Sequence, residues 1–187
     1  MNSVTHDTLI SAEQLAEALR SAHPPLVLDC SFELTNLGAG QQAYDAGHIP
    51  DALYLHLEHA LSAEKTGRNG RHPLPTREAF ARTMAAIGVG NDTQVVACDN
   101  AGGMYAARLW WMLRWAGHRA VAVLDGGTAA RQAPGHAVST EAPPARPHGN
   151  FALREPLVTT LSYEEVRANV ESRHKLVLDA RAPDRFR

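Results

Sequence analysis

The sequence predicts an α/β protein built on an open parallel sheet with helices on both faces. The strand candidates are short, largely apolar runs in the sequence, at residues 26–28, 52–56, 94–98 and 120–124. Short apolar runs without polar alternation are typical of strands that are covered on both faces. Stretches with helical spacing of apolar residues separate these runs, and such alternation is typical of parallel sheets.

The predicted helices begin at recognisable caps. Ser11, with Gln14 three residues further on, forms a capping-box pattern and predicts a helix that ends before Pro24. Thr76 is expected to cap a second helix that runs through Ile87, and a third helix is expected from about 103 to 116; a glycine closes each of them.

Composition excludes several classes of protein. The chain has 187 residues, of which 44% are hydrophobic and 20% charged, as in ordinary globular domains. Its net charge of −2 gives no basic excess for a nucleic-acid partner, and no apolar run is long enough to predict a membrane span. The first residues lack the pattern of a signal peptide, so the expected location is cytoplasmic.

A repeat predicts two domains. Residues 134–156 are rich in proline, which predicts a semi-rigid linker or extended arm. Beyond them, residues 162–166 and 176–179 repeat the pattern of residues 11–15 and 26–29 at nearly the same spacing. The expected organisation is therefore a first domain at 1–133, a linker at 134–156, and the first helix and strand of a second, incomplete domain at 157–187. The alternative is that a helix cap followed by a strand is simply common in α/β proteins.

The loop after the third strand candidate is the strongest candidate for a ligand-binding site in the sequence. Ligands of open parallel sheets bind beyond the carboxyl ends of the strands. There, Gly102 and Gly103 allow backbone N–H groups to converge at the start of a helix, whose dipole adds about half a positive charge. This arrangement predicts a cradle for an anion.

Three motifs in order resemble one family. GHIP at 47–50, VVACDNAGGMYAARLWWMLRWAGH at 95–118 and LDGG at 124–127 together resemble the rhodanese-type sulfurtransferases. The similarity is greatest to the tandem form, the thiosulfate and 3-mercaptopyruvate sulfurtransferases. It implies a rhodanese-like open parallel five-stranded sheet, and a catalytic cysteine in the second domain only. Asp51 departs from the family pattern, which usually has glycine after HIP.

The resemblance implies a loop without a nucleophile. Asp99 stands where the active domain of the family has its cysteine, so a pseudo-active-site loop is expected, with Asp99 as its built-in anion. The loop comprises Asp99, Asn100, Ala101, Gly102 and Gly103.

Cys98 is the rival nucleophile, because a shift of one residue would bring it into the cradle. The alternative, which we favour, is that Cys98 ends its strand and points into the core. The resemblance then leaves the chain with no catalytic residue of its own.

The C-terminal residues supply the expected substrate contact. The sequence LVLDARAPDRFR at 176–187 resembles the start of the family's second domain, which makes Arg185 the residue that binds an anionic sulfur donor. Asp184 replaces the usual glycine, and Arg181 is expected to pair with Asp179.

The implied reaction passes sulfane sulfur from thiosulfate or 3-mercaptopyruvate, through a cysteine persulfide, to cyanide, a thiol or a thioredoxin-like acceptor. It needs no cofactor or metal. The 187-residue chain alone is expected to be inactive.

Other readings are weaker. A non-catalytic rhodanese-like binding or scaffold module is the main alternative. A phosphatase of this fold needs Cys-x5-Arg, but the sixth residue after Cys98 is Met104. A relaxed GxGxxA pattern at 38–43 does not directly follow a strand, as dinucleotide binding requires.

Histidines and tryptophans are read as structural. His48 is expected to hold its own loop by hydrogen bonds, and His56 and His59 to lie at the surface. Trp111 and Trp115, which share a helix face, are expected to pack in the core.

Overall fold

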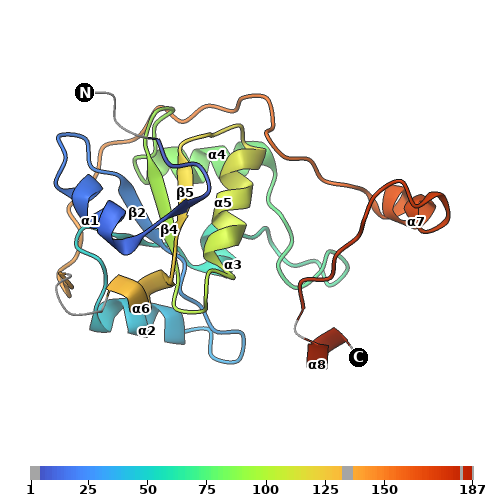
Figure 1. Cartoon of the computed structure of the whole chain (residues 1–187), viewed down its shortest axis with the longest axis horizontal. Coiled ribbons are helices and arrows are strands. Elements are labelled where there is room, and N and C mark those ends of the chain that lie inside the picture. Colours follow the sequence, from blue (N-terminus) through green and yellow to red (C-terminus); the bar gives the residue numbers. More distant parts are fainter. Residues whose placement is uncertain (1–4, 132–136, 182, 187) are drawn as a thin grey trace.

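A computed structural model describes residues 5–131, 137–181 and 183–186, with the side chains of Arg131 and Arg185 excluded. Five parallel strands form one sheet in the order β1-β5-β4-β2-β3 (Figure 1). The strands are β1 (Leu9–Ile10), β2 (Leu26–Asp29), β3 (Leu53–Tyr54), β4 (Val95–Cys98) and β5 (Val121–Leu124). The predicted open parallel sheet is confirmed, and β1 is a strand that the sequence did not predict.

Eight helices lie in the described part of the chain. They are α1 (Ala12–Leu19), α2 (Ala39–Ala46), α3 (Leu57–Ala60), α4 (Arg77–Ala86), α5 (Ala106–Trp115), α6 (Gly127–Arg131), α7 (Tyr163–Ser172) and α8 (Pro183–Phe186). The capping box of Ser11 and the cap of Thr76 are confirmed. The third predicted helix begins at Ala106 rather than near residue 103, because the preceding backbone wraps around the Asp99 carboxylate.

The sheet separates two apolar layers. Leu26 and Leu28 point into the larger layer, which contains buried residues of α3, α4 and α5. Val27 points into the smaller layer with Leu15 of α1 and Tyr44 of α2. Figure 1 shows α1 and α2 on one side of the sheet and α5 on the other. All four residues of β2 and of β4 are buried, as expected for central strands covered on both faces.

The sheet order creates a switch point between β2 and β4. From β2 the chain runs outward to β3, and it then returns to form β4 and β5 on the other side of β2. A crevice at the carboxyl ends of two strands so arranged is the usual ligand site of an open α/β sheet.

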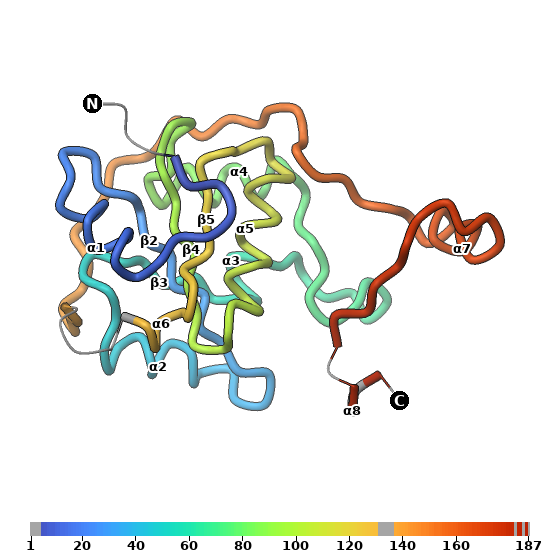
Figure 2. The backbone as a smooth tube through the Cα atoms, in the orientation of Figure 1, coloured from blue at the N-terminus to red at the C-terminus, as the bar shows by residue number. Residues whose placement is uncertain are grey.

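The described part of the proline-rich segment, residues 137–156, lies as an arm along the domain that contains the sheet (Figure 2). Ser139 exchanges two backbone hydrogen bonds with His48, at 2.8 and 2.9 Å, and Arg154 donates to the carbonyl of Ala116 at 3.0 Å. Phe151 is buried in the larger apolar layer. These hydrogen bonds attach the arm to the domain at Ser139 and at Arg154, near the two ends of its described part.

The last described residues extend away from this domain. The helix α7 has no buried residue, and Ser162 caps it with the same capping box as Ser11 in α1. The strand predicted at residues 176–179 is not formed: these residues pair with no strand, and Leu176 and Leu178 are 85% and 80% exposed. Because a strand needs a hydrogen-bonded neighbour, this segment cannot form one without a sheet to join.

Candidate functional site

The loop between β4 and α5 folds around the carboxylate of Asp99. Its Oδ1 accepts the backbone N–H groups of Ala101 and Gly103, and its Oδ2 accepts those of Tyr105 and Ala106, each at 2.8 Å. Asp99 is only 1% exposed. A carboxylate that accepts this many N–H donors has little capacity left to bind anything else.

Local backbone geometry explains why the donors converge. Gly102 and Gly103 have φ of 72° and 90°, in the left-handed region that favours glycine. The helix α5 begins immediately afterwards, and its first N–H groups have no partner within the helix. The negative charge of Asp99 therefore lies against the positive end of the helix dipole, in a place that an external anion would otherwise occupy.

A second turn supports this loop. The carbonyl oxygen of Asp99 accepts the N–H of Thr128 at 2.9 Å. Gly127, within the LDGG turn, has φ of 58°, and a Cβ atom there would lie 2.4 Å from the same carbonyl oxygen. The turn after β5 therefore requires glycine so that its backbone can approach the loop after β4.

The two cysteines lie below the loop, inside the protein. Cys98 is fully buried in the smaller apolar layer, and Cys30 is buried in the larger one. Burial raises the pKa of the Cys98 thiol, and the nearby Asp29, Cys30 and Asp99 raise it further. Cys98 thus points into the core, as the favoured reading expects, and its environment opposes formation of a thiolate.

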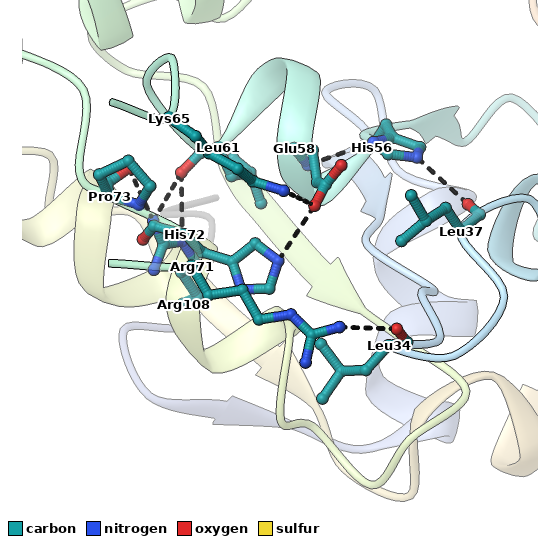
Figure 3. Close-up of polar contacts among 10 residues, drawn as sticks. All are labelled: Leu34, Leu37, His56, Glu58, Leu61, Lys65, Arg71, His72, Pro73 and Arg108. Carbon is teal, nitrogen blue, oxygen red and sulfur yellow. Dashed lines mark hydrogen bonds and ion pairs between the residues drawn. The ribbon is translucent and has the colours of Figure 1, made fainter. Parts of the chain in front are cut away.

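Polar side chains that the sequence reasoning missed gather on the α3 and α5 side of the same sheet edge (Figure 3). Glu58 forms an ion pair with Lys65, and its Oε1 lies 3.4 Å from Nε2 of His72. The hydrogen bond from Lys65 is the main cause of a lowered pKa at Glu58, and burial lowers the pKa of His72. An imidazole that lies beside a carboxylate can take part in proton transfer.

Arg108 holds the loop that carries this cluster. Its Nε and Nη2 donate to the carbonyl of Leu61 at 3.1 and 2.8 Å, and Nη2 also donates to the carbonyl of His72 at 3.0 Å (Figure 3). The ring of Phe32 lies 6.1 Å from that of His72 and 5.5 Å from that of Tyr105, so the cluster borders the Asp99 loop. In the sequence, Arg108 is one of two arginines in the mostly apolar helix α5, and this is the signal that could have pointed to the contact.

The remaining predicted residues are distributed over the fold. His48 is buried, and its ring nitrogens lie 2.8 Å from the carbonyl of Tyr44 and 3.1 Å from that of Glu141, which confirms its structural role. Arg181 pairs with Asp179 as expected. The backbone of Arg185 lies in α8, but its side chain is outside the described residues, so its contact with a donor stays a prediction.

Other candidates take ordinary structural roles. Residues 38–43 cap and begin α2 instead of turning directly out of a strand. His59 is exposed, whereas His56 is half-buried and caps α3. Trp111 and Trp115 stack with ring centroids 5.7 Å apart and are only partly buried. Asp51, where the resembled family usually has glycine, adopts the left-handed φ of 60° that glycine would favour.

Within the described residues, no three histidine, cysteine or acidic side chains are grouped so that they could hold a metal ion. None of the helices described is both long and apolar enough to cross a membrane.

These features define an α/β domain with an open parallel sheet whose anion cradle is filled by its own carboxylate. Residues 11–133 match the model of the rhodanese-like domain. The chain therefore belongs to the rhodanese-like domain family.

Its relatives include named sulfurtransferases. A probable 3-mercaptopyruvate sulfurtransferase of Pseudomonas aeruginosa is 40% identical over 96% of this chain, and a thiosulfate sulfurtransferase of Cricetulus griseus is 34% identical over 100% of it. The chain spans 63% of the length of each of these two proteins. The crystal structure of Escherichia coli SseA, described as a 3-mercaptopyruvate sulfotransferase with the rhodanese fold, superposes with a TM-score of 0.82 and 26% identity, covering 97% of this chain and 68% of SseA.

Proposed function

We propose that this chain is the non-catalytic first domain, with the beginning of the catalytic domain, of a sulfurtransferase that moves sulfane sulfur from thiosulfate or 3-mercaptopyruvate to cyanide or a thiol. The main observation in support of this proposal is that the Asp99 carboxylate fills the anion cradle. In this domain, the site that would stabilise an anionic persulfide holds the carboxylate of Asp99, on four N–H groups. The sulfur must then be carried by a cysteine outside this domain.

The reaction divides into two displacements at sulfur. A cysteine thiolate attacks the outer sulfur of thiosulfate, the S–S bond breaks, and sulfite leaves with the bonding electron pair. With 3-mercaptopyruvate the C–S bond breaks instead, the thiol proton ends on the methyl group, and pyruvate leaves. The persulfide then gives its outer sulfur to cyanide, forming thiocyanate, or to a thiol, and the thiolate is regenerated.

The first domain contributes a rigid wall beside that reaction. Arg185 would hold the charge of the donor, because a guanidinium matches carboxylate and sulfonate oxygens with two parallel hydrogen bonds. A thioredoxin-like protein is a suitable acceptor, since it presents a reactive thiol. Catalysis would take place in the cytoplasm and without a cofactor.

The exposed C-terminal residues support the proposed second domain. Leu176, Val177 and Leu178 are 85%, 64% and 80% exposed, whereas the matching residues of β2 are buried. The Asp179 carboxylate accepts the N–H of Arg181 at 2.9 Å, just as Asp29 accepts that of Ser31 at 2.8 Å. The cap at Ser162 and the turn at Asp179 therefore resemble those at Ser11 and Asp29, and the exposed apolar side chains of residues 176–178 would fit the core of a further sheet.

The second candidate function is a non-catalytic binding or scaffold module. It is favoured by the burial of both cysteines, which leaves the described residues without an accessible thiol nucleophile. In that case the exposed residues 176–178 would be covered by a partner rather than by more of the same chain.

The test is to follow the reading frame beyond Arg187, express the longer product, and measure thiocyanate formed from cyanide with each donor. The enzyme proposal expects a downstream strand that ends in Cys-x-x-Gly, and turnover that is lost when this cysteine is changed to serine. A stop after Arg187, or a longer product that forms no thiocyanate with either donor, would favour the module.

A further inference from the structure

A polar cavity of about 340 Å³ lies beside the pseudo-active-site loop, on the α2 and α6 side of the sheet. Its floor is formed by three buried residues: Asp29, Ser31 and Tyr44. Asn100 and Ala43 are exposed at its rim. The cavity opens at the carboxyl ends of β2 and β4, which is the switch point of this sheet.

Asp29 brings a buried carboxyl group to the wall of this cavity. It is 2% exposed, and its Oδ1 accepts the N–H of Ser31 at 2.8 Å. Among the described residues, no lysine or arginine forms an ion pair with it. Burial raises the pKa of the Asp29 carboxyl, and the charge of Asp99 adds to this shift, whereas the Ser31 hydrogen bonds and the nearby His48 oppose it. A carboxylate has about four acceptor positions, so Asp29 retains capacity for further donors.

The sign of the charge determines which ligand can enter. The Asp99 carboxylate is already matched by four N–H groups, so Asp29 is the carboxyl group that lines the cavity and determines the charge of a ligand there. An anionic sulfur donor is repelled from such a site, and a cation is attracted.

The size of the cavity and the chemistry of its walls narrow the choice among cations. Its volume is many times the ~30 Å³ that one water occupies in the liquid, so an organic cation fills it better than a bare metal ion does. Ser31 and Thr128 also line the cavity, and their hydroxyl groups can accept N–H donors.

We propose that this cavity binds a small organic cation with N–H donors, a guanidinium or primary ammonium compound, with Asp29 as its charge partner. Hydroxyl oxygens of Ser31 and Thr128 take the remaining donors. The site is distinct from the proposed sulfur-transfer chemistry and does not depend on it.

The test is a titration of the 187-residue protein with methylguanidinium, followed by backbone amide NMR. The expected result is saturable shifts at Ser31, Asn100 and Thr128, with a Kd on the order of 1–10 mM for so small a probe. Tetramethylammonium, which is a cation without N–H donors, should bind at least ~10-fold more weakly. Thiosulfate should not shift these amides.

Three variants locate the site. Asp29→Asn keeps the acceptor for the Ser31 N–H but removes the charge, and it should weaken binding at least ~10-fold. Ala43→Leu fills the rim from an exposed helix position and should also abolish the shifts. Asp45→Asn, the matched control, removes one charge from an exposed residue of the same helix outside the cavity, and it should leave the Kd within ~2-fold.

The proposal is overturned if methylguanidinium gives no saturable shifts, or if Asp29→Asn and Ala43→Leu, both folded by their NMR spectra, bind it as well as the unaltered protein. Equal binding of tetramethylammonium, or saturable binding of Mg²⁺ or thiosulfate in preference to methylguanidinium, would also contradict it.

Discussion

The Oδ2 atom of Asp99 lies 2.8 Å from the backbone nitrogen of Ala106, seven positions further along the chain, and accepts its N–H. This bond joins the end of β4 to the first residue of α5. The backbone of the loop between them is therefore arranged around the Asp99 carboxylate, which accepts four of its N–H groups.

Removing that charge should destabilise the domain. Asp99→Asn keeps the shape of the side chain but places an NH₂ group against N–H donors, so we expect a loss of about 2–4 kcal/mol in the free energy of unfolding. Chemical denaturation measures it. Asp125→Asn, at an exposed position after β5, is the control and should change stability by less than ~0.5 kcal/mol. Equal losses in the two variants would show that the cradle contacts contribute nothing specific.

Replacing the acid by a thiol should create a reactive cysteine. In Asp99→Cys the convergent N–H groups and the helix start favour the thiolate, as at other cysteines placed at helix N-termini. Labelling with a disulfide reagent, followed by peptide mass analysis, should modify position 99 at least ~10-fold faster than Cys30 or Cys98. Labelling at Cys98 that is as fast as at position 99 would contradict the assigned geometry.

The Arg108 contacts predict how firmly the loop of residues 61–75 is held. Arg108→Met removes the donors to the carbonyls of Leu61 and His72, and should cost about 1–3 kcal/mol of stability. Limited trypsin digestion should then cut faster after Lys65 and Arg68. Arg82→Met, at an exposed position of α4, is the matched control, and cleavage at the same rate in both variants would refute the tethering.

Asp29 predicts a pH dependence of stability. Burial raises the pKa of its carboxyl in the folded chain above the usual 3.8. The unfolded chain therefore releases this proton at a lower pH than the folded chain does. Above the folded-state pKa, the ionised Asp29 lowers the free energy of unfolding. Below the unfolded-state pKa, the carboxyl is protonated in both states and this loss disappears. We expect Asp29→Asn to gain on the order of 1 kcal/mol at pH 7, and to gain less as the pH falls toward 4. Urea unfolding of both proteins between pH 4 and pH 7 measures this difference in the free energy of unfolding. A stabilisation by Asp29→Asn that increases toward low pH would contradict the prediction.

Much of the fold follows from local sequence. The central strands are continuous apolar runs, and Ser11 and Thr76 have the side chains that cap helices. Both the strands and the helix starts could therefore be predicted without knowledge of distant contacts. The anion cradle was predictable because consecutive glycines between a buried strand and a helix let backbone N–H groups converge. The place of Asp99 within it was expected from the resemblance to the rhodanese family.

The parts that were missed depend on contacts between distant residues. The strand β1 is only two residues long and exists through its pairing with β5. The cluster of Glu58 and His72 requires a loop to fold back onto Arg108, and no local pattern encodes that contact. Conversely, residues 176–179 have the sequence of a strand but no neighbouring strand to pair with in the described chain.

We propose that this domain does not carry the transferred sulfur, because the Asp99 carboxylate already fills its cradle. The most direct measurement is the intact mass of the 187-residue chain after incubation with thiosulfate or 3-mercaptopyruvate, with thiocyanate assayed in parallel after addition of cyanide. We predict no added sulfur atom and no thiocyanate above the protein-free background. A chain that gains one sulfur at Cys98, loses it to cyanide, and fails to gain it after Cys98→Ser would contradict the claim.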